Sequence, residues 1–339
     1  MKSRLHLIGA FAPIFTCAAL FLYFALSTDS FLTRENLLNI LRQNSALAIM
    51  AVGITFVLLT AEIDLSIEYM AIFAGVFAAF LYNAFVDRHA APDGMPAQFV
   101  PIVIALAAAA GLGLVSGFGA ARLGVPSFMM TLSMWLITKG LALKITKGSP
   151  IFNIPPMISY IGTGSIKLFE RTRPDGVVRP LIEIPIITVV AAAFLGVAFV
   201  VLRYTRFGRN VYAVGGNRAA AELSGVNVRR VVTLCMCICA VTAAFAGIVL
   251  TGRLGSAQAG GLDNMLIGCV SAVVLGGTSL FGGKGGIGNT VVGVLTFGIL
   301  HNGLNHKEID IYLKEAITGA ILLAALVLNV SMSRIRTPK

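Results

Sequence analysis

The chain has 339 residues, of which 57% are apolar and only 12% are charged, and its net charge is +11. Soluble domains carry about 25% charged residues, so this composition excludes an ordinary soluble enzyme and predicts a polytopic integral membrane protein. The positive charge does not indicate nucleic acid as a partner, because membrane proteins collect Lys and Arg on their cytoplasmic side. We therefore expect a lipid bilayer to surround the chain.

The apolar residues fall in continuous runs, which favours membrane-spanning helices over the alternating strands of a barrel. We predict an all-α fold with about ten transmembrane helices, organised as one transmembrane domain over residues 1–339. The first run is too long for the apolar part of a typical secretory signal, so we expect it to remain as a span. The predicted spans are 7–27, 44–61, 66–86, 99–120, 125–145, 183–203, 230–251, 265–281, 287–304 and 311–330.

The distribution of Lys and Arg predicts the orientation of these spans. With the first residue in the cytoplasm, the inner segments hold 13 of these cations and the outer segments hold 11, six of which belong to one connection at 144–182. Longer loops follow the positive-inside rule least reliably, and without this connection the count is 13 against 5. Both termini are therefore predicted to be cytoplasmic. Residues 146–182 then form an extracytoplasmic loop, in which turn residues at 171–176 predict a short helix or hairpin.

Two segments resemble binding motifs but lack essential residues. The stretch from Gly276 to Gly285 approaches the phosphate-binding pattern G-x-x-x-x-G-K-[ST], yet Thr278 stands where the pattern needs glycine and Gly285 where it needs Ser or Thr. We therefore expect no nucleotide site in this chain, no enzyme activity of its own, and any ATP hydrolysis in another subunit. The cysteines at 235, 237 and 239 do not share one helix face, so we interpret them as packing residues and expect no metal ion or other cofactor.

Glycines crowd the connection that follows residue 275, and they permit two interpretations. Either this connection is a tight re-entrant corner beside a transport pathway, with Gly276, Gly277 and Thr278 lining it, or it is a plain cytosolic turn. A second glycine pattern, formed by Gly113 and Gly117, has the spacing that brings two helices close together, within the chain or between two copies.

A break between the second and third predicted spans contains Glu62, Asp64, Ser66 and Glu68. Charges at membrane depth are costly and tend to face a cavity or a partner, so these residues are candidates for a translocation pathway. They also keep open an ion-coupled secondary carrier as an alternative function. The other interpretation is that the break lies in water at the cytoplasmic interface. At the outer end of the ninth span, residues 301–306 include hydrogen-bonding side chains.

The basic segment 204–229 lies between two long apolar runs, and its pattern predicts a short helix. Asn217 is a suitable N-cap, the alanines that follow favour a helix over 218–224, and Gly225 is suited to a left-handed helix end. A helix of this length is marginal alone, which favours an element that docks in a groove of a partner protein. The alternative is a surface loop with an incidental helix.

The sequence around this helix resembles the coupling loop of permease subunits in bacterial ATP-binding cassette importers of the ribose and xylose type. Ala220, Ala221 and Gly225 match the Ala-Ala-x-x-x-Gly part of the permease signature. The resemblance covers residues 36–329. Four further stretches resemble this family in the same order, at 51–66, 126–132, 256–258 and 272–285.

The resemblance implies a ten-span permease of the bacterial inner membrane that pairs with a second permease copy or a paralogue. It implies a cytosolic ATP-binding cassette ATPase, and an extracytoplasmic solute-binding protein that delivers a monosaccharide or a related sugar or sugar alcohol. A branched-chain amino acid or nucleoside permease of the same superfamily is the alternative within this class. The residues implied to contact the ATPase are Gly216, Asn217, Ala220, Ala221, Glu222 and Gly225.

The chain departs from the family pattern in two places. Glu68 stands where the family often has glycine, and residues 266–268 read Leu-Ile-Gly where the family often has Glu-Leu-Asp. We interpret these changes as a sign of a different cargo, or of a heterodimer whose other subunit keeps the family pattern.

Overall fold

The computed structural model describes residues 2–89, 94–172, 178–260 and 264–336. Within these ranges the chain is largely helical, and its β-structure includes one hairpin. The elements are α1 (Lys2–Ser27), α2 (Arg34–Leu59), α3 (Ile67–His89), α4 (Met95–Ala121), α5 (Ser127–Thr146), α6 (Pro156–Thr163), β1 (Ser165–Thr172), β2 (Val178–Pro185), α7 (Ile186–Tyr204), α8 (Arg206–Gly216), α9 (Arg218–Leu223), α10 (Val228–Leu254), α11 (Met265–Leu275), α12 (Ile287–His306) and α13 (Ile311–Arg336).

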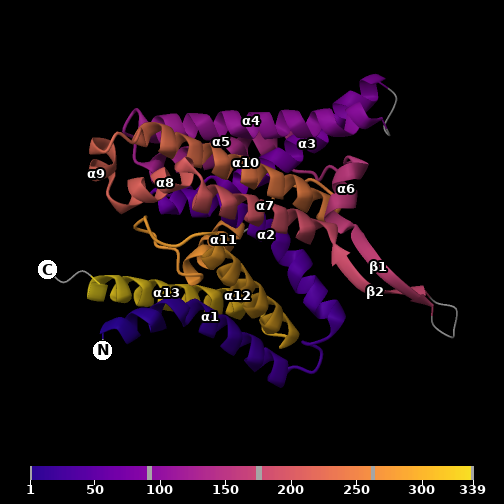
Figure 1. Cartoon of the computed structure of the whole chain (residues 1–339). Helices are drawn as coiled ribbons and strands as arrows, with labels where there is room; N and C mark the ends of the chain where they lie inside the picture. Colours follow the sequence, from indigo (N-terminus) through magenta and orange to yellow (C-terminus); the bar gives the residue numbers. More distant parts are fainter. Residues whose placement is uncertain (1, 90–93, 173–177, 261–263, 337–339) are drawn as a thin grey trace.

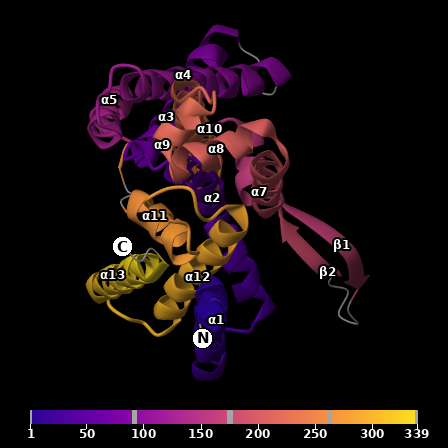
Figure 2. The ribbon, with the colours of Figure 1, turned by 60° about the vertical axis from the view of Figure 1, so that its left-hand side comes forward.

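The long helices run between two ends of a bundle (Figure 1). The short helices α8 and α9 lie at one end, which we name the coupling end, and β1 and β2 project from the other, which we name the hairpin end (Figures 1 and 2). The beginning of α1 and the end of α13 lie at the coupling end. This placement agrees with the prediction that both termini share a side with segment 204–229, while the side itself stays a prediction.

Among the described helices, seven are long and apolar enough to cross a bilayer: α2, α3, α4, α5, α7, α10 and α12. The predicted span 265–281 is wrong in length, because α11 ends at Leu275. Gly276 and Gly277 follow it, and the positive φ of 93° at Gly277 is incompatible with continuing the helix. With 11 residues α11 is about 16 Å long, roughly half of the hydrocarbon core. The total of ten crossings stays a prediction.

The connection predicted to contain a short helix or hairpin contains both. Helix α6 is followed by β1 and β2, which pair antiparallel from Ser165 opposite Pro185 to Thr172 opposite Val178. The hairpin is tied to the bundle by Arg42 of α2, which donates to the Ser165 hydroxyl at 3.2 Å and lies 3.7 Å from the Glu183 carboxylate. The start of α2 is therefore fixed at the hairpin end.

Helix α10 lies at the centre of the bundle and packs against α2, α3 and α4. Glycine makes all three contacts close, as two of them illustrate. A Cβ on Gly53 of α2 would lie 2.7 Å from the Cα of Cys239, and a Cβ on Gly117 of α4 would lie 2.6 Å from the Cα of Thr233. Gly113 contacts α10 in the same way. The GxxxG pattern therefore brings two helices of this chain together, one of the two uses that its spacing predicts.

Replacing Gly113 by leucine is expected to destabilise the protein, because a Cβ there would lie 2.6 Å from the Cβ of Ala240. Overpacking of this kind costs about 1–3 kcal/mol, which should appear as a lower unfolding temperature in detergent. Gly111→Leu is the matched control, since a Cβ at that position meets no atom within 4 Å. Equal stability of the two variants would contradict the α4–α10 contact.

Candidate coupling site

The capping residues of α9 are those that the sequence predicts. The Asn217 side chain accepts a hydrogen bond from the backbone N–H of Ala220 at 3.0 Å, as an N-cap does. At the other end, Gly225 has a φ of 82°, its N–H donates to the Glu222 carbonyl, and the N–H of Val226 donates to the Ala221 carbonyl. This pair of bonds is a Schellman motif, which satisfies carbonyls that a helix end leaves open. The helix ends at Leu223, one residue before the predicted end.

Most of α9 is exposed. Residues 217–220 and 222–225 are all exposed, and Leu223 keeps 91% of its surface accessible. Ala221 is the exception, because only 5% of its surface is accessible and it belongs to the core of this chain. The Ala-Ala pair of the signature is therefore split between two roles: Ala220 faces outward and Ala221 anchors the helix to the permease. A bulky residue at 221 would disturb this chain's own packing as well as any contact with a partner.

Backbone contacts join the end of α8 to two other segments. A Cβ on Gly215 would lie 1.8 Å from the carbonyl oxygen of Leu59, the last residue of α2, and 2.6 Å from the backbone nitrogen of Gly283. The N–H of Gly283 donates to that same Leu59 carbonyl at 3.0 Å. We name the contact of Leu59, Gly215 and Gly283 the coupling junction. It connects α8 to α2 and to the glycine-rich turn before α12 without any side chain between them.

Side chains reinforce the coupling junction on both sides. The Tyr212 hydroxyl donates to the Gly285 carbonyl at 3.0 Å. Burial raises the pKa of Tyr212 above its ordinary value, although Arg203 opposes the shift, so the hydroxyl remains protonated at neutral pH and can donate this bond. Phe207 of α8 stacks on Phe56 of α2 with ring centroids 6.1 Å apart. These two side chains thus attach α8 to α2 and to the turn in addition to the backbone contacts of the coupling junction.

An ion pair links α9 to the connection between α2 and α3, the break that contains the predicted acidic residues. The Arg218 guanidinium donates to the Glu62 carboxylate at 2.7 Å, with the Arg218 side chain half exposed and the Glu62 side chain mostly buried. Pairs with this much exposure contribute little to stability, about 1 kcal/mol or less, so the pair chiefly orients the start of α9. No local pattern connects these two residues, which are 156 positions apart.

The candidate pathway residues of the break are buried. Glu62, Asp64, Ser66 and Glu68 each have less than a tenth of their surface accessible, so the interpretation as a water-exposed interfacial break is wrong for these side chains. Asp64 accepts bonds from the backbone N–H and the hydroxyl of Ser66 at 2.8 and 2.6 Å. The extended backbone at 63–65 is held by the hydroxyls of Ser127 and Thr131 of α5 at 3.2 and 3.1 Å.

A hydrogen bond of Glu68 joins the two segments in which the chain departs from the family pattern. Its carboxylate accepts a hydrogen bond from the backbone N–H of Leu266 at 2.9 Å, in the first turn of α11. Asn264, the residue at the N-cap position of α11, makes no side-chain capping bond. A carboxylate from α3 therefore satisfies a backbone donor at the start of a half-length helix, where the helix dipole also favours a negative charge.

The other candidate pathway residues lie elsewhere. Gly276, Gly277 and Thr278 follow the opposite end of α11 from Glu68, about 16 Å away along the helix. Gly276 is held against α12, since the Asn289 side chain donates to its carbonyl at 2.7 Å, and the Thr278 hydroxyl accepts from the Gly286 N–H at 3.5 Å. The structure therefore divides the predicted set between the two ends of α11, and whether either group lines a pathway stays a prediction.

The long helices are suited to crossing a bilayer, and a capped and exposed helix lies at one end of them. This combination is typical of a membrane permease component. The chain belongs to the family of branched-chain amino acid transport system permease components, which it matches over residues 36–326. This confirms the resemblance over 36–329 and identifies a multi-pass protein of the inner membrane. A permease component of this kind implies an ATPase and a binding protein as partners in general.

Named relatives are similar over most of the chain. It is 37% identical to the ribose import permease protein RbsC of Escherichia coli strain K12, with 89% of this chain and 88% of that protein covered. It is 33% identical to the ribose import permease protein RbsC of Bacillus subtilis strain 168, with 97% and 96% covered. It is 29% identical to the xylose transport system permease protein XylH of Haemophilus influenzae, with 96% of each covered. No solved structure was found to match the chain.

Proposed function

We propose that this chain is the transmembrane subunit of an ATP-driven importer and forms the pathway for a monosaccharide or a related sugar or sugar alcohol. The observation that carries the proposal is α9, an exposed and capped helix at the coupling end, which directly follows α8, the helix whose end is joined by backbone contacts to α2 and to the turn before α12. The relatives named for ribose and xylose transport support the cargo class.

The proposal assigns ATP hydrolysis to a cytosolic cassette ATPase that binds α9, and cargo delivery to an extracytoplasmic binding protein. A second copy or a paralogue of this chain completes the pathway. ATP-driven closure of the ATPase moves α9, and the coupling junction passes this movement to α2 and α12. On this proposal the coupling end faces the cytoplasm.

The ion-coupled carrier is the alternative from another class, and the buried carboxylates motivated it. Such a carrier needs an acid that is available to the coupling ion at the midplane. Here Glu62 is paired with Arg218, Asp64 is bonded to Ser66, and Glu68 accepts from Leu266. These internal bonds favour a structural use of the three acids and therefore favour the ATP-driven importer.

Replacing an exposed apolar side chain of α9 by a charged one tests the proposal. In proteoliposomes that contain the permease with its cassette ATPase and binding protein, Leu223→Glu should reduce both ATP-driven sugar uptake and stimulated ATP hydrolysis by roughly tenfold or more, since it introduces a charge into an apolar contact. Leu123→Glu, at an exposed leucine between α4 and α5, is the control and should have little effect. ATP hydrolysis by the purified chain alone, or uptake driven by an ion gradient without ATP, would refute the proposal.

A further inference from the structure

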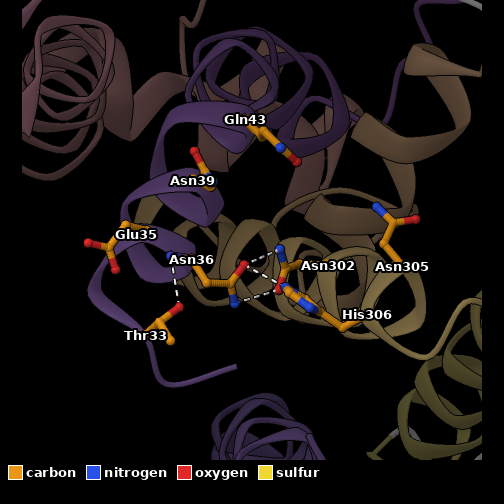
Figure 3. A pocket seen from close by; sticks show the side chains of 8 residues that line it. All are labelled: Thr33, Glu35, Asn36, Asn39, Gln43, Asn302, Asn305 and His306. Carbon is orange, nitrogen blue, oxygen red and sulfur yellow. Dashed lines mark hydrogen bonds between the residues drawn. The ribbon is translucent and has the colours of Figure 1, made fainter. Parts of the chain in front are cut away.

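A polar pocket of about 390 Å³ opens at the hairpin end between the first turns of α2 and the last turns of α12 (Figure 3). Its volume lies within the range of about 300–1,000 Å³ that is typical of small-molecule sites. Every described side chain of the lining is polar, and five of these eight are carboxamides. The lining residues are Thr33, Glu35, Asn36, Asn39, Gln43, Asn302, Asn305 and His306.

The back wall of the pocket is a fixed network of hydrogen bonds. Asn36 and Asn302 are both buried and exchange two bonds, with the Asn36 amide donating at 3.0 Å and the Asn302 amide donating at 2.8 Å. The Nε2 of His306 lies 2.9 Å from the side-chain oxygen Oδ1 of Asn36, and its Nδ1 lies 3.1 Å from the Ser30 hydroxyl. Because these hydrogen bonds join side chains of α2 to side chains of α12, they keep the two helices at a defined separation on either side of the pocket.

The open side of the pocket carries side chains with unused hydrogen-bonding capacity. Asn39 and Gln43 follow Asn36 at the spacing that places all three on one stripe of α2. Both side chains are exposed, and neither forms a hydrogen bond with another described residue. Each carboxamide has both hydrogen-bond donors and acceptors. A hydroxyl group also has both, so the two kinds of group can bond to each other in either direction.

We propose that this pocket binds a free, uncharged polyhydroxylated molecule, of the class of a monosaccharide or sugar alcohol, before it enters the pathway. The inference rests on the proposed function, because that function places the hairpin end on the side from which cargo arrives. Among the described residues that line the pocket there is no lysine or arginine to pair with the carboxylate of an amino acid, and no apolar side chain to hold a hydrophobic ligand. The carboxamides of Asn39 and Gln43 at the opening suit the hydroxyl groups of such a molecule, while the wall behind them is held by its own hydrogen bonds.

Binding to the full-length permease in nanodiscs, without its partner subunits, tests the proposal. Radiolabelled D-ribose and D-xylose are the probes, and L-leucine is the comparison. Asn39→Ala and Gln43→Ala should each weaken sugar binding about two- to tenfold, as the loss of one hydrogen bond does, and the double variant should weaken it more. Leu41→Ala changes an exposed side chain of the same helix that does not line the pocket, and it should bind as the wild type does.

The inference is overturned if neither sugar binds the wild type saturably, if leucine binds instead, or if Leu41→Ala weakens binding as much as the pocket variants. It is also overturned if the pocket variants bind both sugars as tightly as the wild type does. ATP-driven uptake by the assembled wild-type importer is a separate readout. Uptake without pocket binding would leave the proposed function standing, whereas pocket binding without ATP-driven uptake would count against that function alone.

Discussion

Gly215→Val is expected to abolish ATP-driven uptake in the assembled importer without unfolding the membrane-spanning helices. The first atom of any side chain at 215 would lie 1.8 Å from the Leu59 carbonyl oxygen, so α8 must separate from α2. Even if the junction absorbs the clash at a cost of about 1–3 kcal/mol, the coupled arrangement becomes roughly five- to 150-fold less populated. Uptake and stimulated ATP hydrolysis in proteoliposomes measure the effect.

A glycine of the neighbouring helix α7 supplies the control for this prediction. A Cβ on Gly196 meets no atom within 4 Å, and the residue is exposed. Gly196→Val therefore introduces the same side chain without separating α8 from α2. If the two variants transport equally well, the coupling junction does not transmit movement. Unchanged pocket binding of sugar in Gly215→Val would show that the hairpin end remains intact.

The second large effect is expected at Glu68. In Glu68→Leu the N–H of Leu266 loses a charged acceptor in a partly buried position, which costs about 1–3 kcal/mol and releases the start of α11. Uptake should fall severalfold, and the unfolding temperature in detergent should fall with it. Glu68→Gln keeps an acceptor oxygen of similar reach and should retain most of both properties.

The comparison between the two Glu68 variants separates two roles. If Glu68 serves mainly to hold α11, glutamine rescues uptake and stability together. Equal loss of uptake in both variants, with stability retained in Glu68→Gln, would instead show that the negative charge itself acts in transport. A wild-type unfolding temperature for Glu68→Leu would contradict the capping role altogether.

Local signals in the sequence were sufficient for the parts of the fold that depend on neighbouring residues. The N-cap at Asn217 and the left-handed Gly225 are determined by backbone chemistry within one turn, and the structure has both. The pairing of β1 with β2 agrees with the hairpin predicted for the long connection, although the predicted turn residues at 173–176 lie outside the described residues. The glycines at 113 and 117 predict a close helix contact for the same reason, although the sequence does not say that α10 is the partner.

The features that were not predicted all depend on segments far apart in the chain. Nothing in the pattern around Gly215 names Leu59, and the pairing of Glu62 with Arg218 crosses 156 positions. The shortness of α11 was missed because apolar residues continue beyond the helix, whereas glycine conformation ends it at Leu275. The polar stripe of α2 at Asn36, Asn39 and Gln43 was overlooked because a few carboxamides do not stand out until α12 faces them.

The close packing of Gly53 against α10 gives α2 the geometry of a lever. Leu59 lies about 9 Å from Gly53 along the helix axis, and Asn36 lies about 26 Å away on the other side. If α2 pivots where Gly53 holds it, a small shift of Leu59 swings Asn36 in the opposite direction through about three times the distance. A sub-ångström push at the coupling junction would then shift Asn36, together with the α12 side chains that are bonded to it, at the far end. Movements at the two ends of the permease would be opposite in direction.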